Sequence, residues 1–191
     1  MRYEKGHKET TRQHILDVAS KQFRKGGIES VGIAGLMKDS GLTNGAFYTH
    51  FKSKEHLVRE VLISAFDKQQ QTFIEALKHG LTIEDAIRNY LSAKQRDHCD
   101  ESCPGPSLMS EIARHSKVTR NVFTEKVQQL IDLFSNQIKE SDPVKKQRKS
   151  IAIYAQLIGS LQLARVVTNK EESDLILESG IDAAIDMVNR S

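Results

Sequence analysis

The chain has 191 residues, of which 38% are hydrophobic, and it carries a formal net charge of +3, three prolines and two cysteines. This length can bury a hydrophobic core without disulfide staples. The sequence has no apolar run of about 18 residues to cross a bilayer, and no secretory leader opens it. We therefore expect a folded protein of the cytoplasm that has no membrane partner.

The positive charge is concentrated near the amino terminus. Through Glu60 the chain has eleven basic and seven acidic residues, which leaves this third at +4 and the remainder at about −1. A basic segment on a near-neutral body is typical of proteins that bind a polyanion such as DNA. The excess is modest, so it supports that interpretation and does not carry it alone.

The first helix is predicted over about residues 10–26. Ile15, Leu16 and Phe23 belong to one apolar face at helical spacing, and basic residues occupy the other face. Glycines 26 and 27 should end this helix, because glycine commonly follows a basic last turn. The residues before it are polar, and their lysines and arginine could contact phosphates: Arg2, Lys5 and Lys8.

Two short helices are expected next, over about residues 33–38 and 44–50. Gly41 lies in the turn between them, where a tight corner requires a positive φ, and Thr43 follows it as the expected N-cap. The entry to the earlier helix is weakly capped, since Gly32 is one of only two candidates. Three helices in about fifty residues, the last two joined by a glycine turn, are typical of a helix-turn-helix domain.

The rest of the chain is also expected to be helical. Apolar periodicity predicts further helices over about residues 53–79, 82–95, 108–115, 118–138, 144–167 and 172–189. Residues 99–106 contain two prolines and a glycine and form the most loop-like stretch. We therefore predict an all-α chain of about nine helices, with a small helical head over residues 1–52 and a larger body over residues 53–191.

The last two predicted helices are apolar on more than one face. Such helices must be buried nearly all round, and a chain of this size has limited interior for two of them. We interpret them as core on one side and subunit interface on the other, although burial inside a monomer is the alternative. The expected dimer interface comprises Tyr154, Leu157, Gly159, Leu161, Ile181 and Ile185.

Residues of about 10–60 resemble the amino-terminal domain of the TetR/AcrR family of transcriptional regulators. The resemblance rests on Ile15-Leu16, Ala19, Phe23, Gly27, Gly41-Leu42-Thr43, Gly45-Ala46-Phe47-Tyr48-Thr49-His50-Phe51, Lys52-Ser53-Lys54-Glu55 and Leu57. It implies a non-enzymatic regulator without a cofactor, whose body binds a small-molecule effector and forms a homodimer. Such a dimer would bind a palindromic operator in double-stranded DNA, most often as a repressor. The sequence does not distinguish a repressor from a regulator that is activated by its ligand.

The resemblance has departures in the second helix. Most members begin that helix with two hydroxyl residues and then a basic residue that contacts the DNA backbone. Here Val31-Gly32 and Ala34 occupy those places. One cap and one phosphate contact are therefore not expected in this chain.

The third helix should supply most of the DNA contacts, because phosphate contacts position a protein and base contacts specify the sequence. Tyr48, His50 and Lys54 are expected to reach phosphates. Thr43, Asn44 and Thr49 are the candidates for base edges. Gly45 and Ala46 have little or no side chain and would let the helix lie close to the groove floor. Phe47 and Phe51 are expected in the core instead.

The effector site is predicted among the helices between Phe66 and Ile138. Its candidate lining residues are Phe66, Phe73, Tyr90, Met109, Ile112, Phe123 and Phe134. For each of them, a place in the ordinary core is the alternative.

Cys99 and Cys103 suggest two further hypotheses. One is sensing of oxidants or electrophiles by a thiol, which requires a nearby cation such as Arg96 or His98. The other is a metal site built from both thiolates and a histidine, His98 or His115, although the spacing is not that of a common zinc module. A helical ligand carrier or an enzyme is a third class, but the sequence has no glycine-rich phosphate loop and no nucleophile elbow.

Overall fold

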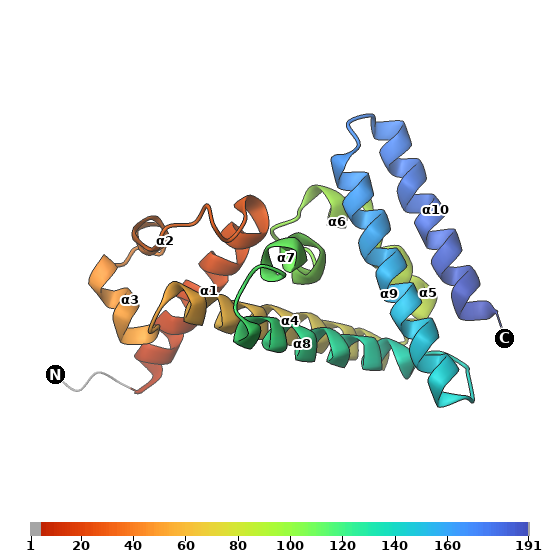
Figure 1. Ribbon diagram of the computed structural model, residues 1–191, viewed down its shortest axis with the longest axis horizontal. Helices are drawn as coiled ribbons and strands as arrows, with labels where there is room; N and C mark the ends of the chain where they lie inside the picture. The colour runs from red at the N-terminus through yellow and green to blue at the C-terminus, as the bar shows by residue number, and fades with distance from the viewer. Residues whose placement is uncertain (1–4, 191) are drawn as a thin grey trace.

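The computed structural model describes residues 5–190, and these form ten helices without a strand (Figure 1). Their bounds are α1 Lys5–Gly26, α2 Ile33–Asp39, α3 Asn44–His50, α4 Lys54–Lys78, α5 Ile83–Tyr90, α6 Ala93–Asp97, α7 Pro104–Ile112, α8 Lys117–Ser135, α9 Pro143–Val166 and α10 Lys170–Asn189. The all-α prediction is confirmed. Helices α1 to α3 gather at one end of the molecule, the long pair α4 and α8 runs along its length, and α9 and α10 form a hairpin at the other end.

Local signals in the sequence explain most helix ends. Ser53 caps α4 by accepting a hydrogen bond from the backbone of His56, and Thr82 forms a capping box with Asp85 at the start of α5. Asp142 caps α9, with Pro143 in the first helical position, where its missing N–H costs nothing. Gly80 has a φ of 90° just after α4.

Three boundaries differ from the predictions. α1 begins at Lys5 instead of about residue 10, because its first turns are exposed and polar and give no apolar period. The helix predicted over residues 82–95 is interrupted, since α5 ends at Tyr90 and the short helix α6 follows over Ala93–Asp97. α7 begins at Pro104 and not near Leu108; Pro106 is also within its first turn, where backbone N–H groups have no intrahelical acceptor. Arg2 lies outside the described residues.

One hydrophobic core extends from the amino-terminal helices into the body. Phe23, Phe47 and Phe51 are buried with Leu36 and Met37 between α1, α2 and α3. Helix α4 continues this cluster through its own apolar face, from Leu57 to Phe66. The division of the chain at residues 52 and 53 stays a prediction, since α4 contributes to the packing on both sides of it.

Polar contacts also fix the amino-terminal helices to the body. The Glu111 carboxylate on α7 accepts hydrogen bonds from the backbone N–H groups of Ile28 (2.9 Å) and Glu29 (3.2 Å) in the loop between α1 and α2. Arg12 of α1 pairs with Glu60 of α4 and places its guanidinium 5.4 Å from the centre of the Phe51 ring. Movement of α4 or α7 therefore acts directly on the helices that carry the candidate DNA surface.

None of the helices in the described part of the chain is long and apolar enough to cross a membrane.

Candidate functional site

The turn before α3 has the geometry that the sequence predicts. Gly41 has a φ of 70°, and α3 spans Asn44–His50 with Thr43 at its N-cap position. The Thr43 side chain makes no capping hydrogen bond, however, so its hydroxyl remains available at the surface. Gly32 likewise gives α2 no side-chain cap, as its residue type requires.

Helix α3 divides into a buried face and an exposed face. Phe47 is fully buried, and its ring contacts Phe51 at a centroid distance of 5.5 Å. Thr43, Asn44, Gly45, Tyr48 and Thr49 are exposed, and Tyr48 is 63% exposed. A short helix with an exposed tyrosine beside small and polar residues can enter the major groove of DNA while its buried face stays packed on the core.

The two small residues differ in their surroundings. A Cβ added to Gly45 would meet nothing within 4 Å, so this position leaves open space in front of the helix. Ala46 is half-buried and packs against the core. The Thr49 hydroxyl donates to the Ala46 carbonyl at 2.7 Å, which leaves its lone pairs to accept from a base or a sugar.

His50 and Lys54 are less free than the sequence suggests. His50 is half-buried, its Nδ1 has no hydrogen-bond partner among residues 5–190, and burial, with Lys8 and Arg12 nearby, lowers its pKa. The lowered pKa favours the neutral imidazole in the DNA-free protein. The Lys54 ammonium lies 3.4 Å from the Glu29 carbonyl and 4.0 Å from the Glu29 carboxylate, which holds it beside the loop between α1 and α2.

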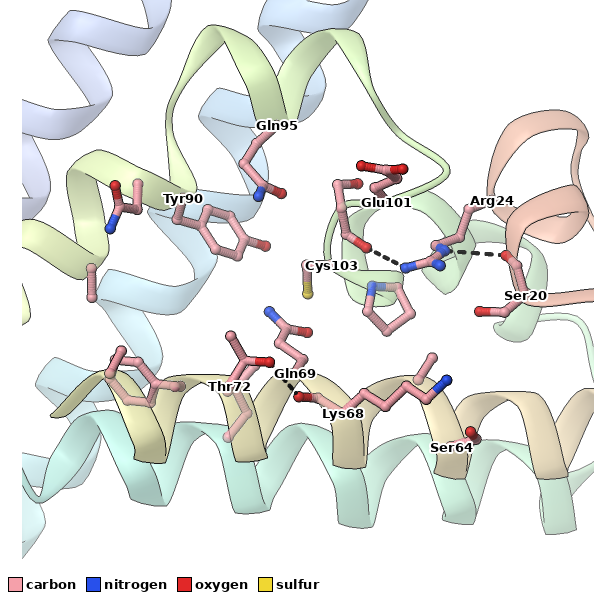
Figure 2. Close-up of a pocket in the computed structure, with 18 of the residues that line it drawn as sticks. Ser20, Arg24, Ser64, Lys68, Gln69, Thr72, Tyr90, Gln95, Glu101 and Cys103 are labelled. Atoms are coloured by element: carbon pink, nitrogen blue, oxygen red, sulfur yellow. Dashed lines mark hydrogen bonds between the residues drawn. The ribbon is translucent and has the colours of Figure 1, made fainter. Parts of the chain in front are cut away.

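A cavity of about 660 Å³ lies between α1, α4, α5, α7 and α8 (Figure 2). Three of the seven candidate effector-site residues, Phe73, Tyr90 and Phe134, line this cavity. Phe73 and Phe134 stack with ring centroids 5.1 Å apart at one apolar end. Its volume is in the range of sites that enclose drug-sized ligands.

The other four predicted lining residues do not reach this cavity. Phe66 and Ile112 are buried in the core, and Phe66 packs edge-to-face on Phe123 at 5.6 Å. Met109 and Phe123 also lie away from the cavity wall. Helical spacing identifies an apolar face, but it does not tell which members of that face meet a void and which meet a neighbouring helix.

The cavity contains polar residues that sequence reasoning missed. Arg24 of α1 donates to the carbonyls of Ser102 (2.6 Å) and Ser20 (3.1 Å), and burial lowers its pKa. Gln69 and Thr72 of α4 also line the wall. Gln69 and Thr72 lie on the same helical face as Phe73 and Ala76, and a polar pair on an otherwise apolar stripe is the one signal that could have found them.

The two cysteines occupy different environments. Cys103 is buried in the cavity wall, with its Sγ 4.0 Å from the Tyr154 hydroxyl, whereas Cys99 is half-buried. One of the two cations proposed for them, Arg96, is engaged elsewhere, since it bonds Asp97 at 2.7 Å and Asp174 at 2.5 Å. Arg24 and Arg165 are the arginines near enough for their charges to interact with both cysteines.

The metal hypothesis finds no geometric support. His115 lies beside Glu55, 2.7 Å from its carboxylate, between α7 and α8, and not beside Cys103. Within residues 5–190 no three histidine, cysteine, aspartate or glutamate side chains converge as metal ligands.

The predicted interface residues divide between core and surface. Tyr154, Leu157 and Leu161 are buried inside the chain, at 4%, 0% and 0% exposure, so they cannot face a partner. Gly159 is exposed, and Ile181 and Ile185 are half-buried. The outward stripe of α9 consists of small and apolar residues at spacings of three and four, and Gly159 is the one predicted interface residue among them: Ala152, Ala155, Gly159, Leu163 and Val166. Helical phase places them opposite the buried residues.

Known proteins resemble this chain in both sequence and fold. The family described as bacterial regulatory proteins, tetR family, matches residues 15–61. The regulator AcrR of Shigella flexneri is 47% identical over 51 residues, which are 27% of this chain and 24% of AcrR. The repressor DhaR of a Mycobacterium species is 23% identical over 188 residues, covering 91% of this chain and 92% of DhaR.

The crystal structure of reduced Escherichia coli NemR has a TM-score of 0.79 with this chain at 20% identity, covering 95% of this chain and 98% of NemR. The matched segment contains the turn at Gly41 and all of α3. Residues 15–61 are a TetR-family domain.

This domain is the helix-turn-helix DNA-binding domain of bacterial transcriptional regulators, and the relatives that match this chain, AcrR and DhaR, are such regulators. The family match covers α2, α3 and most of α1, and it ends at Val61 in α4. The cavity and the α9 stripe lie largely or wholly outside this segment, so what they do must be argued from their own geometry.

Proposed function

We propose that this protein is a repressor that binds a palindromic operator as a homodimer and is released by a small-molecule effector. The observation that carries the proposal is that one cavity is lined both by α1 of the DNA-binding helices and by α4, the helix that leads from them into the body. A ligand in this position contacts both parts at once. The cytoplasm, where such DNA lies, is the proposed compartment.

The proposed DNA contacts come from the exposed face of α3 and the start of α4. Tyr48 would contact a phosphate, while Thr43, Asn44 and Thr49 would meet base edges. Gly45 and Ala46 would allow close approach to the groove. His50 would act as a neutral hydrogen-bonding group, and Lys54 would supply positive charge once its contact with Glu29 is loosened.

Dimerisation is proposed through the outward stripe of α9 together with α10. Leu163 and Val166 are 55% and 77% exposed, and Leu175 of α10 is 61% exposed. The small residues of the same stripe would let a partner helix approach closely, and a Cβ added to Gly159 would meet nothing within 4 Å. Two heads held in this way would read two half-sites separated by whole helical turns of DNA.

Release would follow from differential affinity. An effector shifts the equilibrium only if it binds one conformation better than the other. The cavity wall includes Arg24 of α1 bonded to Ser102 of the loop before α7, so a ligand that changes this contact would move α1 against the body. By reciprocity, operator DNA would weaken effector binding by the same factor.

Two experiments test this function. DNase footprinting of the promoter beside the gene should reveal protection over an inverted repeat. A fluorescence-anisotropy titration of that fragment should then show an affinity that falls steeply with salt. Absence of any shift at low salt would falsify the DNA-binding proposal, and a cavity ligand that leaves operator affinity unchanged would remove the effector proposal alone.

A redox- or electrophile-responsive regulator of the same fold is the second candidate, because Cys103 lies in the cavity wall. A reagent entering the cavity would reach its thiol directly. Replacing Cys99 and Cys103 by serine should abolish the response to an oxidant in this case, and an unchanged response would exclude it.

A further inference from the structure

Two buried polar atoms in the cavity make no conventional hydrogen bond within residues 5–190, and the second of them lies beside the Cys103 thiol, which is only a weak partner. They are the Oε1 of Gln69 on α4 and the hydroxyl of Tyr90 on α5. Figure 2 shows both side chains directed toward the space around the Cys103 thiol, in the middle of the cavity. A buried polar atom without a hydrogen bond costs free energy, so such a pair at one place indicates a ligand that completes it.

The charged residues of the cavity, in contrast, already have partners or face solvent. Arg24 donates to two carbonyls, and Lys68 pairs with Asp17. Lys21 and Glu101 are exposed. The buried atoms that still lack a strong hydrogen bond therefore belong to neutral side chains and not to the charged residues of the cavity.

The chemistry of the pair defines what the ligand must offer. Gln69 Oε1 can only accept a hydrogen bond, so the ligand needs a donor there. Burial raises the pKa of Tyr90 well above its usual value, so its hydroxyl stays protonated, and the neighbouring Cys103 thiol is only a weak acceptor that a ligand oxygen can replace. A single hydroxyl group satisfies both, because it donates to the amide oxygen and accepts from the phenol.

The wall also includes neutral polar residues such as Ser64 and Gln95, but more of its surface is apolar, which favours an apolar ligand body. The aliphatic and aromatic lining residues are Phe73, Ala76, Leu81, Ala86, Leu130 and Phe134, and the Phe73 and Phe134 rings stack on each other. From these contacts we infer that the effector is a neutral, mainly apolar molecule whose hydroxyl bridges Gln69 and Tyr90. This inference rests on the proposed function only in treating the cavity as the effector site.

Calorimetry with the full chain and no DNA tests the inference directly. The probes are naphthol, its methyl ether, which accepts but cannot donate, and naphthoate, which is anionic. Naphthol should bind about tenfold more tightly than the ether, because the ether leaves Gln69 Oε1 buried and unpaired. Naphthoate should bind more weakly than naphthol.

Matched variants assign the effect to the pair. Gln69→Met and Tyr90→Phe should each reduce the preference for naphthol over the ether to about threefold or less. Without ligand, neither variant should lower the melting temperature appreciably, since neither the Gln69 Oε1 nor the Tyr90 hydroxyl has a strong hydrogen-bond partner. Thr72→Val is the control: this residue lines the same wall, but its hydroxyl already donates to the Lys68 carbonyl at 2.9 Å, so the preference should persist.

Three results would overturn the inference. They are equal binding of naphthol and its ether, tighter binding of naphthoate that depends on Arg24, and failure of all three probes to bind at millimolar concentration. None of these measurements involves DNA. A chain that protects its operator but does not discriminate the probes would contradict this inference alone, whereas a discriminating chain that binds no operator would contradict the proposed function alone.

Discussion

The Nδ1 of His115 lies 2.7 Å from the carboxylate of Glu55, and this contact joins the first turn of α4 to the segment before α8. The other carboxylate oxygen of Glu55 accepts from Ser116 (2.7 Å) and Thr119 (2.5 Å). One carboxylate at the head end of the connecting helix is therefore bound by three groups of the body.

Glu55→Ala should lower the free energy of unfolding by about 1–3 kcal/mol, because it leaves the buried Thr119 hydroxyl without its acceptor. Partial exposure of Glu55 keeps the effect modest. Urea denaturation of the variant and the parent at neutral pH measures it. Glu125→Ala on the exposed face of α8 is the control and should change little.

The same carboxylate should make stability depend on acid. Burial alone would raise its pKa, but the hydrogen bonds from Thr119, Ser116 and His115 outweigh this and lower the pKa from 4.5 to about 2. Because folding depresses the pKa, the stabilisation is complete above about pH 4.5 and is lost as the pH falls toward 2. Unfolding free energies across this window should fall less steeply in Glu55→Gln than in the parent; parallel curves would contradict the assignment.

Two glycines of the helix-turn-helix should respond oppositely to alanine. At Gly41 the φ of 70° is strained for any side chain, and nothing within 4 Å would clash, so Gly41→Ala should destabilise by about 1–2 kcal/mol through the backbone alone. Gly35 is within α2, also without neighbours, and Gly35→Ala should stabilise by about 0.5–1 kcal/mol. Thermal melts of both variants compare the signs, and equal shifts would contradict the argument.

Tyr48→Phe should weaken operator binding about fivefold, because it removes one hydrogen bond to a phosphate and keeps the ring. Tyr48 is 63% exposed, so the melting temperature should not change.

Lys54→Ala should reduce the slope of log affinity against log salt by about 1. Lys139→Ala, exposed in the loop before α9, is the charge-matched control for Lys54. A slope change of equal size in the control would mean that Lys54 has no special place.

Leu163→Glu should convert the proposed homodimer to a monomer, since it places a charge in the proposed interface, where two copies would face each other. Light scattering coupled to size exclusion measures the mass. Val118 is exposed to a similar degree, 60%, at the start of α8, so Val118→Glu should leave the mass unchanged. A dimer that survives Leu163→Glu would move the interface away from the α9 stripe.

Local chemistry made much of this protein predictable. The positive φ at Gly41, the cap at Ser53 and the proline after Asp142 each act within a few residues, so the sequence alone locates the helix ends they control. For the same reason the bounds of α3 and the burial of Phe47 agree with prediction. Polar first turns, as in α1, carry no such signal, and there the predicted boundary is wrong.

Only the tertiary structure decided which apolar residues face which neighbour. Helical periodicity gives a face to Phe66 and Phe73 alike, yet Phe66 packs on Phe123 while Phe73 lines the cavity. It gives α9 two apolar sides without saying that Leu157 points inward and Leu163 outward. The unpaired Gln69 and Tyr90 belong to different helices. Their meeting depends on how α4 and α5 pack, because a cavity is what side chains distant in sequence leave unfilled.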